Sequence, residues 1–307
     1  MLTSYDTILK MAKSKGRVPF VVAGANGEAI LRAAIQSREE GMMEPVLIGR
    51  ASEIHQISEK HHLSLESIQI IDESDDRAIV HQAATLLHHG EVKALMKGNI
   101  STPVLLKGIL DPRYELRTER LLSHVALMEI ASYHKLLLIT DGGVMIRPDL
   151  REKVHILKNA IDVLRRLNVE PVKVAILSAN EKVNPRLPET VDAEKLVEMG
   201  RRGEFGTAVV EGPLALDMAF SKEAARIKKV ESRVAGDPDI LLVPDVSCGN
   251  ILAKGLVHLA GARISGVVVG AKMPIALISR AERQETWRLS IALANVLAET
   301  ENHRRSL

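Results

Sequence analysis

Hydroxyl and amino groups gather in LMKGNISTPVLLKGIL (95–110), a stretch with the residue types of an anion site. An apolar run ends on Lys97 and Gly98, and Ser101-Thr102-Pro103 then has the composition of a helix start. Lys107 is predicted to lie on the same helix. Helix capping explains one of the two hydroxyls but does not account for the two lysines. The pattern therefore favours binding of an anionic ligand.

A second polar group stands near the C-terminus, at the end of another apolar run. The run GVVVGAKMPIALI (266–278) leads directly to Ser279 and Arg280, and Glu285 follows. A hydroxyl and a guanidinium side by side at the end of a buried strand are suited to holding a reacting group. Taken alone, the segment has an equally good structural explanation: Ser279 would cap a helix starting at Ala281, and Arg280 would be solvated.

A third candidate is VPDVSCGNILAKGL (243–256), where an apolar run ends before a predicted helix. Gly249 and Asn250 are expected to form a turn at the helix start, with backbone N–H groups available to a ligand. Cys248 is interpreted as an incidental thiol, because free cysteine mostly behaves as a small hydrophobic residue.

The remaining candidates have plain structural explanations. The turn in VVAGANGEAI (21–30) lacks a full G-x-G-x-x-G pattern and reads as an ordinary strand-to-helix turn. Arg117, Arg120 and His124 are close in sequence, and surface solvation is the usual fate of such residues. Neither H-E-x-x-H nor a Cys/His cluster occurs, so no metal site is expected.

Composition narrows the class of protein. The 307 residues, 46% hydrophobic and 26% charged, predict a folded globular chain of one large or two medium domains. A net charge of +2 with three Phe, three Tyr and one Trp disfavours nucleic acid as a partner. No apolar stretch approaches the ~20 residues of a membrane span. The first 16 residues read as an amphipathic helix and the single cysteine excludes an internal disulfide, so we expect a cytoplasmic protein.

Short β-branched runs alternate with amphipathic segments along most of the chain. Runs that are apolar on both faces and separated by helices indicate a parallel sheet covered on both sides. LSHVALMEI and KLLLITDGG are too close together for a crossover helix, so an antiparallel pair is expected there. The pattern predicts an α/β protein of two lobes with a cleft between them, and ligands of such sheets collect at the carboxyl ends of the strands.

Five stretches in this order resemble the phosphate acetyl/butyryltransferase family over nearly the whole chain. They are LMKGNIST, RTERLLSHVALME, VVEGPLALDMAFS, SRVAGDPDILLVPDVSCGNILAKGL and GVVVGAKMPIALISRAERQET. VNPRLPETVDAEKL and the compact length are more similar to the butyryl branch than to the acetyl branch.

The resemblance implies a fold and an activity. The fold is a two-lobed α/β structure similar to isocitrate and isopropylmalate dehydrogenases, with mostly parallel sheets, an interdomain cleft, and a first domain of 1–120 plus 266–307 around a second of 121–265. The activity is reversible transfer of a short acyl group, butyryl favoured, between coenzyme A and inorganic phosphate, giving an acyl phosphate. A homodimer or higher homo-oligomer is implied, and coenzyme A is a substrate, with no permanently bound cofactor.

The resemblance also assigns roles to residues. Ser279 and Arg280 match the family's serine-arginine pair, and Glu285 matches its catalytic acid. Glu285, with a pKa raised by burial in the cleft, would take the proton of the coenzyme A thiol, whose own pKa is ~8.5. Arg280 and Ser279 would stabilise the tetrahedral oxyanion. Arg280, Ser101, Thr102 and Lys107 would hold phosphate; Lys107 stands where relatives often have arginine, and lysine binds phosphate less directionally.

Other functions stay open from the sequence. A phosphate acetyltransferase differs only in the length of the acyl chain, and each methylene is worth only ~1–3 kcal/mol of discrimination. A catalytically silent acyl-coenzyme A-binding module is a second alternative, which intact Ser279, Arg280 and Glu285 disfavour. A metal-dependent hydroxyacid dehydrogenase of the same fold would need clustered aspartates, and the sequence has none at such spacing.

Overall fold

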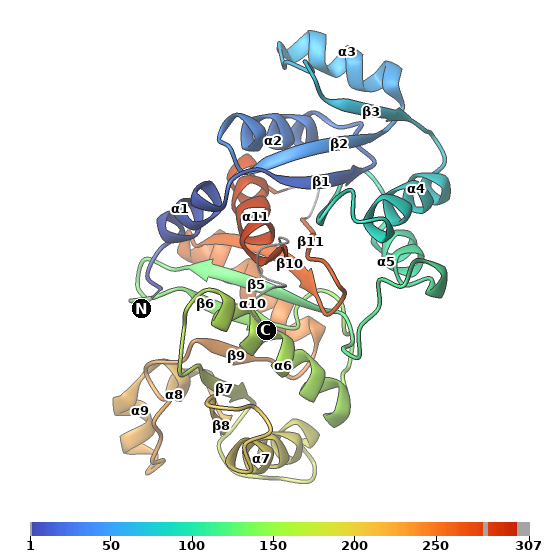
Figure 1. The fold of residues 1–307 in the computed structure, drawn as a ribbon. Coiled ribbons are helices and arrows are strands. Elements are labelled where there is room, and N and C mark those ends of the chain that lie inside the picture. Colours follow the sequence, from blue (N-terminus) through green and yellow to red (C-terminus); the bar gives the residue numbers. More distant parts are fainter. Residues whose placement is uncertain (1, 279–281, 300–307) are drawn as a thin grey trace. The chain divides into compact units, whose positions relative to one another are not determined.

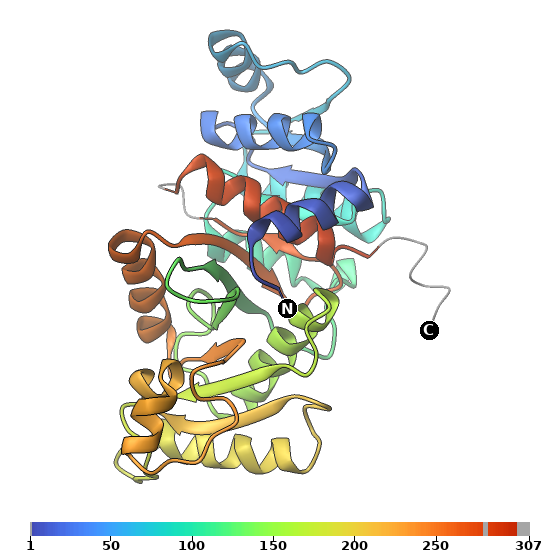
Figure 2. The ribbon, with the colours of Figure 1, turned by 90° about the vertical axis from the view of Figure 1, so that its left-hand side faces the viewer.

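A computed structural model of the chain describes residues 2–278 and 282–299 (Figures 1 and 2). The chain divides into two compact units. The first unit comprises Tyr5–Arg120 and the chain from Ser265 onward, and the second comprises Leu121–Ile264 and the residues before Tyr5. The sequence places 1–120 in one domain, but Leu2 belongs to the second unit because its carbonyl oxygen accepts a hydrogen bond from the Leu136 N–H at 2.9 Å.

The first unit is built on a mostly parallel sheet with the strand order β3-β2-β1-β4-β11-β10. All neighbours are parallel except β10 and β11, which run antiparallel. The strands are β1 (Val18–Ala23), β2 (Met43–Gly49), β3 (Gln69–Asp72), β4 (Ala94–Lys97), β10 (Arg263–Val269) and β11 (Ile275–Ala276). The apolar run 266–278 is therefore not one strand, since it turns back between β10 and β11.

The order of the strands reverses between β1 and β4. From β1 the chain moves outward to β2 and β3, and it then crosses to the other side of β1 to form β4. Helix α4 makes this crossing and packs on β1 and β2, while α11 packs between α1 and α2 (Figure 1). The helices of the unit are α1 (Tyr5–Lys15), α2 (Glu28–Glu39), α3 (Ala51–His61), α4 (Asp76–His88), α5 (Thr102–Ile109) and α11 (Gln284–Leu297), with a 3₁₀ turn at Pro112–Tyr114.

In the second unit the strands follow the order β5-β6-β9-β7-β8. The pair β5 and β6 is antiparallel, and the other neighbours are parallel. The strands are β5 (Ser123–Glu129), β6 (Leu137–Thr140), β7 (Lys173–Leu177), β8 (Val209–Leu214) and β9 (Ile240–Leu242). The helices are α6 (Leu150–Arg166), α7 (Pro188–Arg201), α8 (Leu216–Phe220), α9 (Lys222–Ile227) and α10 (Val246–Ala260).

The predicted α/β class with mostly parallel strands is confirmed, and so is the antiparallel pair in the middle of the chain. Within the described residues, no helix has the length and apolar character to cross a membrane. The same residues contain no group of three or more His, Cys, Asp or Glu side chains that could hold a metal ion.

A cluster of charges lies at the amino ends of β6, β7 and β9 in the second unit. The buried Lys135 ammonium contacts Asp237 at 2.7 Å and Asp239 at 2.6 Å. Lys173 contacts the other oxygen of Asp237 at 2.5 Å, and His134 lies 2.8 Å from the oxygen that Lys135 contacts. Burial alone would raise the pKa of Asp237, but the hydrogen bonds from Lys135, Lys173 and His134 hold that pKa far below its ordinary value.

This cluster predicts a loss of stability in acid. Because the pKa of Asp237 is lower in the folded than in the unfolded chain, its contribution is complete above the ordinary carboxyl pKa of ~4 and is lost as the pH falls below it. We expect the urea midpoint of the natural chain to fall more steeply between pH ~5 and ~3 than that of Asp237→Asn. Asp217→Asn, which removes an exposed partner of Lys228, should change the slope little. Equal slopes for all three proteins would contradict this assignment.

Candidate active site

The carboxyl ends of β1 and β4 meet at the point where the strand order reverses, which is where open α/β sheets bind ligands. The turns after the two strands are joined directly: Gly98 N–H donates to Ala23 O at 2.8 Å, and Asn99 N–H donates to Gly24 O at 2.6 Å. A Cβ atom on Gly98 would overlap the Gly24 carbonyl oxygen. Glycine is therefore required at position 98 by the close approach of the two backbones.

Lys97 is the last residue of β4 and its side chain is only 5% exposed. Strand β11 lies beside β4 in parallel, with Ala276 opposite Met96. The chain that follows Ala276 thus reaches the same sheet edge as Lys97. Ser279 and Arg280 come next in sequence, and they lie outside the described residues.

Helix α5 begins at this edge as the sequence predicts. Ser101 is its N-cap and accepts a hydrogen bond from Val104 N–H at 3.4 Å, and Pro103 stands in the first turn. The Thr102 hydroxyl has no hydrogen-bond partner among the residues that the structure describes. Lys107 is exposed in the last turn, about 9 Å along the helix axis from Ser101 at a rise of ~1.5 Å per residue. Ser101 and Thr102 thus stand at the start of α5, in the segment that follows Lys97, and Lys107 lies further along the helix.

Glu285 occupies the first turn of α11, and its side chain is exposed. The helix starts at Gln284 with Arg283 as its N-cap, later than the expected start at Ala281. The N-cap position of this helix belongs to Arg283, and Ser279 lies outside the described residues.

In the second unit, Gly249 and Asn250 lie inside α10 and not in a turn before it. Asp245 is the N-cap and accepts from Cys248 N–H at 2.9 Å, while Gly249 N–H donates to Asp245 O at 3.2 Å. Gly249 is needed here because a Cβ atom would lie 2.7 Å from the Gly142 Cα. The Asn250 amide donates to Gly142 O at 3.4 Å. The expected donor turn is corrected: the Gly249 N–H is used by the helix, and Asn250 offers an exposed side chain.

Several plain interpretations agree with the structure. Gly24 N–H and Ala25 N–H both donate to Ile48 O, at 2.9 and 2.8 Å. These two backbone donors of the turn are therefore used within the protein and are not available to a ligand. Partial burial, together with neighbouring Asp245, raises the pKa of the Cys248 thiol, which makes its nucleophilic thiolate scarcer. The surface solvation expected for His124 is wrong: it lies in β5, where burial lowers the pKa of its imidazole against the opposing effect of Asp141.

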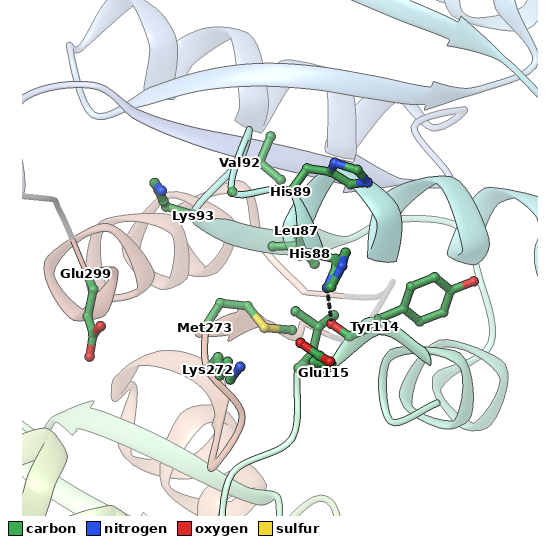
Figure 3. A pocket seen from close by; sticks show the side chains of 12 residues that line it. Leu87, His88, His89, Val92, Lys93, Tyr114, Glu115, Lys272, Met273 and Glu299 are labelled. Carbon is green, nitrogen blue, oxygen red and sulfur yellow. Dashed lines mark hydrogen bonds between the residues drawn. The ribbon is translucent and has the colours of Figure 1, made fainter. Parts of the chain in front are cut away.

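The first unit also has a pocket of about 420 Å³ that is distinct from this edge (Figure 3). Its walls include Lys93, just before β4, and Lys272 and Met273, just before β11. His88 closes one side, with Nδ1 at 2.8 Å from the Tyr114 carbonyl oxygen. Since β4 and β11 are parallel, the pocket lies at their amino ends, opposite to Lys97. Because it lies at the opposite end of the strands, this pocket is not part of the candidate active site.

Comparison with known proteins identifies relatives over nearly the whole chain. The family described as phosphate acetyl/butaryl transferase matches residues 73–295. A phosphate butyryltransferase of Clostridium acetobutylicum is 36% identical over 298 residues, which cover 97% of this chain and 99% of the relative. A phosphate acetyltransferase of Thermotoga maritima is 40% identical over 293 residues, which cover 95% of this chain and 99% of the relative.

Comparison with solved structures points to the same family. The chain superimposes on a branched-chain phosphotransacylase from Enterococcus faecalis V583 with a TM-score of 0.80 and 30% identity, covering 92% of this chain and 100% of the other. A 4-hydroxythreonine-4-phosphate dehydrogenase from Klebsiella pneumoniae gives a TM-score of 0.57 at 16% identity, with 92% of this chain and 100% of the other covered. The second likeness concerns the fold alone, and it confirms the expected similarity to a dehydrogenase fold.

Proposed function

This chain belongs to the phosphate acetyl/butyryl transferase family, and from that premise we propose that it is an acyltransferase that moves a short acyl group between coenzyme A and inorganic phosphate. Butyryl is the favoured group, on the strength of the butyryl-like sequence features. The alternative is acetyl as main substrate, since relatives of both names are similarly close. The family assignment weighs against a silent binding module.

The parallel pairing of β4 with β11 is the observation that supports this function best. It directs the chain leading to Ser279 and Arg280 toward the edge that already holds the buried Lys97 and the start of α5. A buried ammonium beside a helix N-terminus is a favourable environment for an anion, because both carry positive charge. Phosphate, or the phosphoryl end of an acyl phosphate, is the anion that the proposed reaction requires.

In the proposed reaction, some residues bind phosphate and others take part in the chemical step. Lys97, Ser101 and Thr102 bind phosphate at the sheet edge, and Lys107 adds positive charge further along α5. Arg280 and Ser279 stabilise the oxyanion that forms when the thiol attacks the acyl-phosphate carbonyl carbon. Glu285 takes the thiol proton, and phosphate leaves as the tetrahedral intermediate collapses. The attack occurs directly in a ternary complex, without an acyl-enzyme.

In the second unit, Asn250 and the segment around Gly249 are proposed to contact coenzyme A. The exposed Asn250 amide retains a donor and an acceptor beyond its bond to Gly142. We further propose a cytoplasmic homodimer or higher homo-oligomer, in line with the family resemblance.

The test is phosphate-dependent release of free thiol. Purified protein is mixed with acetyl-, butyryl- or isobutyryl-coenzyme A, with and without inorganic phosphate and without added metal. We expect thiol release only when phosphate is present, with kcat/KM highest for a four-carbon acyl group. Highest kcat/KM for acetyl-coenzyme A would support the acetyl alternative. Absence of turnover with every acyl group, while coenzyme A still binds, would overturn the proposed function.

A further inference from the structure

The pocket of about 420 Å³ in the first unit is enclosed by four segments that are far apart in the chain (Figure 3). They are the end of α4, the residues before β4, the residues around the end of the 3₁₀ turn, and the turn between β10 and β11. Its volume lies in the range of about 300–1,000 Å³ that is typical of small-molecule sites. The lining residues all belong to the first unit, namely Leu87, His88, His89, Gly90, Val92, Lys93, Tyr114, Glu115, Leu116, Lys272, Met273 and Glu299.

Backbone hydrogen bonds hold the walls of this pocket in place. Lys272 N–H donates to Leu116 O at 3.0 Å, which ties the turn between β10 and β11 to the segment after the 3₁₀ turn. Lys93 N–H donates to Pro19 O at 2.8 Å, which fixes the start of β4 against the chain entering β1. The pocket is therefore formed by the fold itself, as most small-molecule sites are.

The floor of the pocket is apolar. Leu87, Val92, Leu116 and Met273 contribute to it, and each of these side chains is at most 7% exposed. The charged side chains stand above them, with Lys93 half-buried and Lys272 and Glu115 exposed. A ligand in this pocket thus meets an apolar surface on one side and charged groups on the other.

Positive charge exceeds negative charge among the unpaired groups of the pocket. Within the part of the chain that the structure describes, neither the Lys93 nor the Lys272 ammonium has an ion-pair or hydrogen-bond partner. Glu115 is a carboxylate without an ion pair among the same residues, whereas Glu299 has an interaction of its own. Two ammonium groups against one such carboxylate favour an anionic ligand.

Two histidines add polar groups to the same wall. His88 Nδ1 lies 2.8 Å from Tyr114 O (Figure 3), and because a carbonyl oxygen only accepts, Nδ1 carries the hydrogen. Its Nε2 makes no hydrogen bond to a described residue, so it can accept from a protonated phosphate oxygen, or donate when the ring is charged. The His89 ring stands edge-on to His88, with 5.4 Å between the ring centroids.

The end of α4 does not cancel this preference for an anion. The carboxyl end of a helix repels anions through its open carbonyl oxygens. Here the turn that follows the helix occupies these oxygens: the N–H groups of His89, Glu91 and Gly90 donate to Thr85 O, Leu86 O and Leu87 O at 3.0, 3.0 and 3.1 Å. The two lysines are therefore not needed as caps for the helix.

We propose that this pocket is a second ligand site, which binds a phosphate monoester with an apolar body. The phosphoryl group, with up to two negative charges, is attracted by the ammonium groups of Lys93 and Lys272, and its oxygens lie within reach of His88. The apolar body covers Leu116 and Met273. The pocket lies at the amino ends of β4 and β11, opposite to Lys97, so this ligand is separate from the phosphate of the proposed reaction.

The test is calorimetric binding of phenyl phosphate, which has both a phosphoryl group and an apolar body. Inorganic phosphate and phenol have one part each, and both should bind at least about tenfold more weakly to this pocket. Lys93→Ala and Lys272→Ala are each expected to lower the affinity for phenyl phosphate about tenfold, since each removes one charge-assisted contact. Lys10→Ala is the matched control: Lys10 is exposed on α1 of the same unit and does not line the pocket. It should leave the affinity within about twofold.

A variant of the candidate active site separates the two phosphate sites. Lys97→Met removes the ammonium at the opposite end of β4, so phenyl phosphate should still bind to it, and that binding should fall when Lys93→Ala is added. Loss of binding in Lys97→Met, without loss in Lys93→Ala or Lys272→Ala, would place the probe at the sheet edge and overturn the inference. No binding of phenyl phosphate to the natural chain, or an affinity no higher than that of inorganic phosphate, would overturn it as well. Thiol release by the natural chain tests the proposed function separately.

Discussion

Replacing Arg280 by alanine is expected to lower kcat/KM for butyryl-coenzyme A and phosphate by about 10²–10³, the typical loss when one oxyanion donor is removed. The guanidinium is proposed to act twice, on the phosphate and on the developing oxyanion. Arg280→Lys should recover only part of the loss, because an ammonium lacks the two-pronged geometry of arginine. The measurement is initial thiol release at several phosphate concentrations, which separates kcat from the KM for phosphate.

Arg283→Ala is the matched control for this prediction. Arg283 stands close by in sequence, is exposed, and precedes the first turn of α11 as its N-cap without a side-chain capping bond. Its removal changes the local charge as much as the loss of Arg280 does, and it should leave kcat/KM within about threefold. Similar losses in both variants would mean that Arg280 acts only through overall positive charge.

Gly98→Ala is the second substitution with a large expected effect. The new methyl group would overlap the Gly24 carbonyl oxygen and lie 2.8 Å from that of Ala23, and backbone atoms have little freedom to move away. Separating the two turns also weakens the hydrogen bonds that Gly98 and Asn99 donate across them. We expect a loss of about 3 kcal/mol or more in the free energy of unfolding, from overpacking and lost hydrogen bonds together.

The Gly98 variant should lose activity as well as stability, because the same turn fixes Lys97 at the edge of the sheet. The midpoint of urea unfolding and the KM for phosphate are the two quantities to measure. Gly255→Ala, at a position with open space around the Cβ, should match or slightly exceed the natural stability, because alanine favours a helix over glycine. A Gly98→Ala protein as stable as this control would show that the two turns do not need their close contact.

Local structure was predictable wherever neighbouring residues determine it. Ser101 and Pro103 carry the chemistry of a helix start, and the structure places them there. The short separation of β5 and β6 allowed only an antiparallel pair, which is what forms. The β-branched runs separated by amphipathic segments likewise predicted a mostly parallel α/β protein.

Predictions failed where a residue's environment depends on distant segments. Gly249 looked like a turn residue, yet it lies in α10, and glycine is needed there because Gly142 packs so closely that no side chain fits. In the second unit, Ala126 of β5 and Ala253 of α10 line one small cavity of about 90 Å³, which left no sequence signal because the two residues are far apart in the chain.

The sequence by itself determined the class of fold, the order of most elements and the family, because these follow from local periodicity, capping residues and motifs in a fixed order. Only the tertiary structure decided that β11 lies parallel to β4 at the reversal of the strand order, that Gly98 must be glycine, and that small residues of β5 and α10 face one another. The physical reason is that close packing joins residues through space, and the contacts it requires leave no periodic trace along the chain.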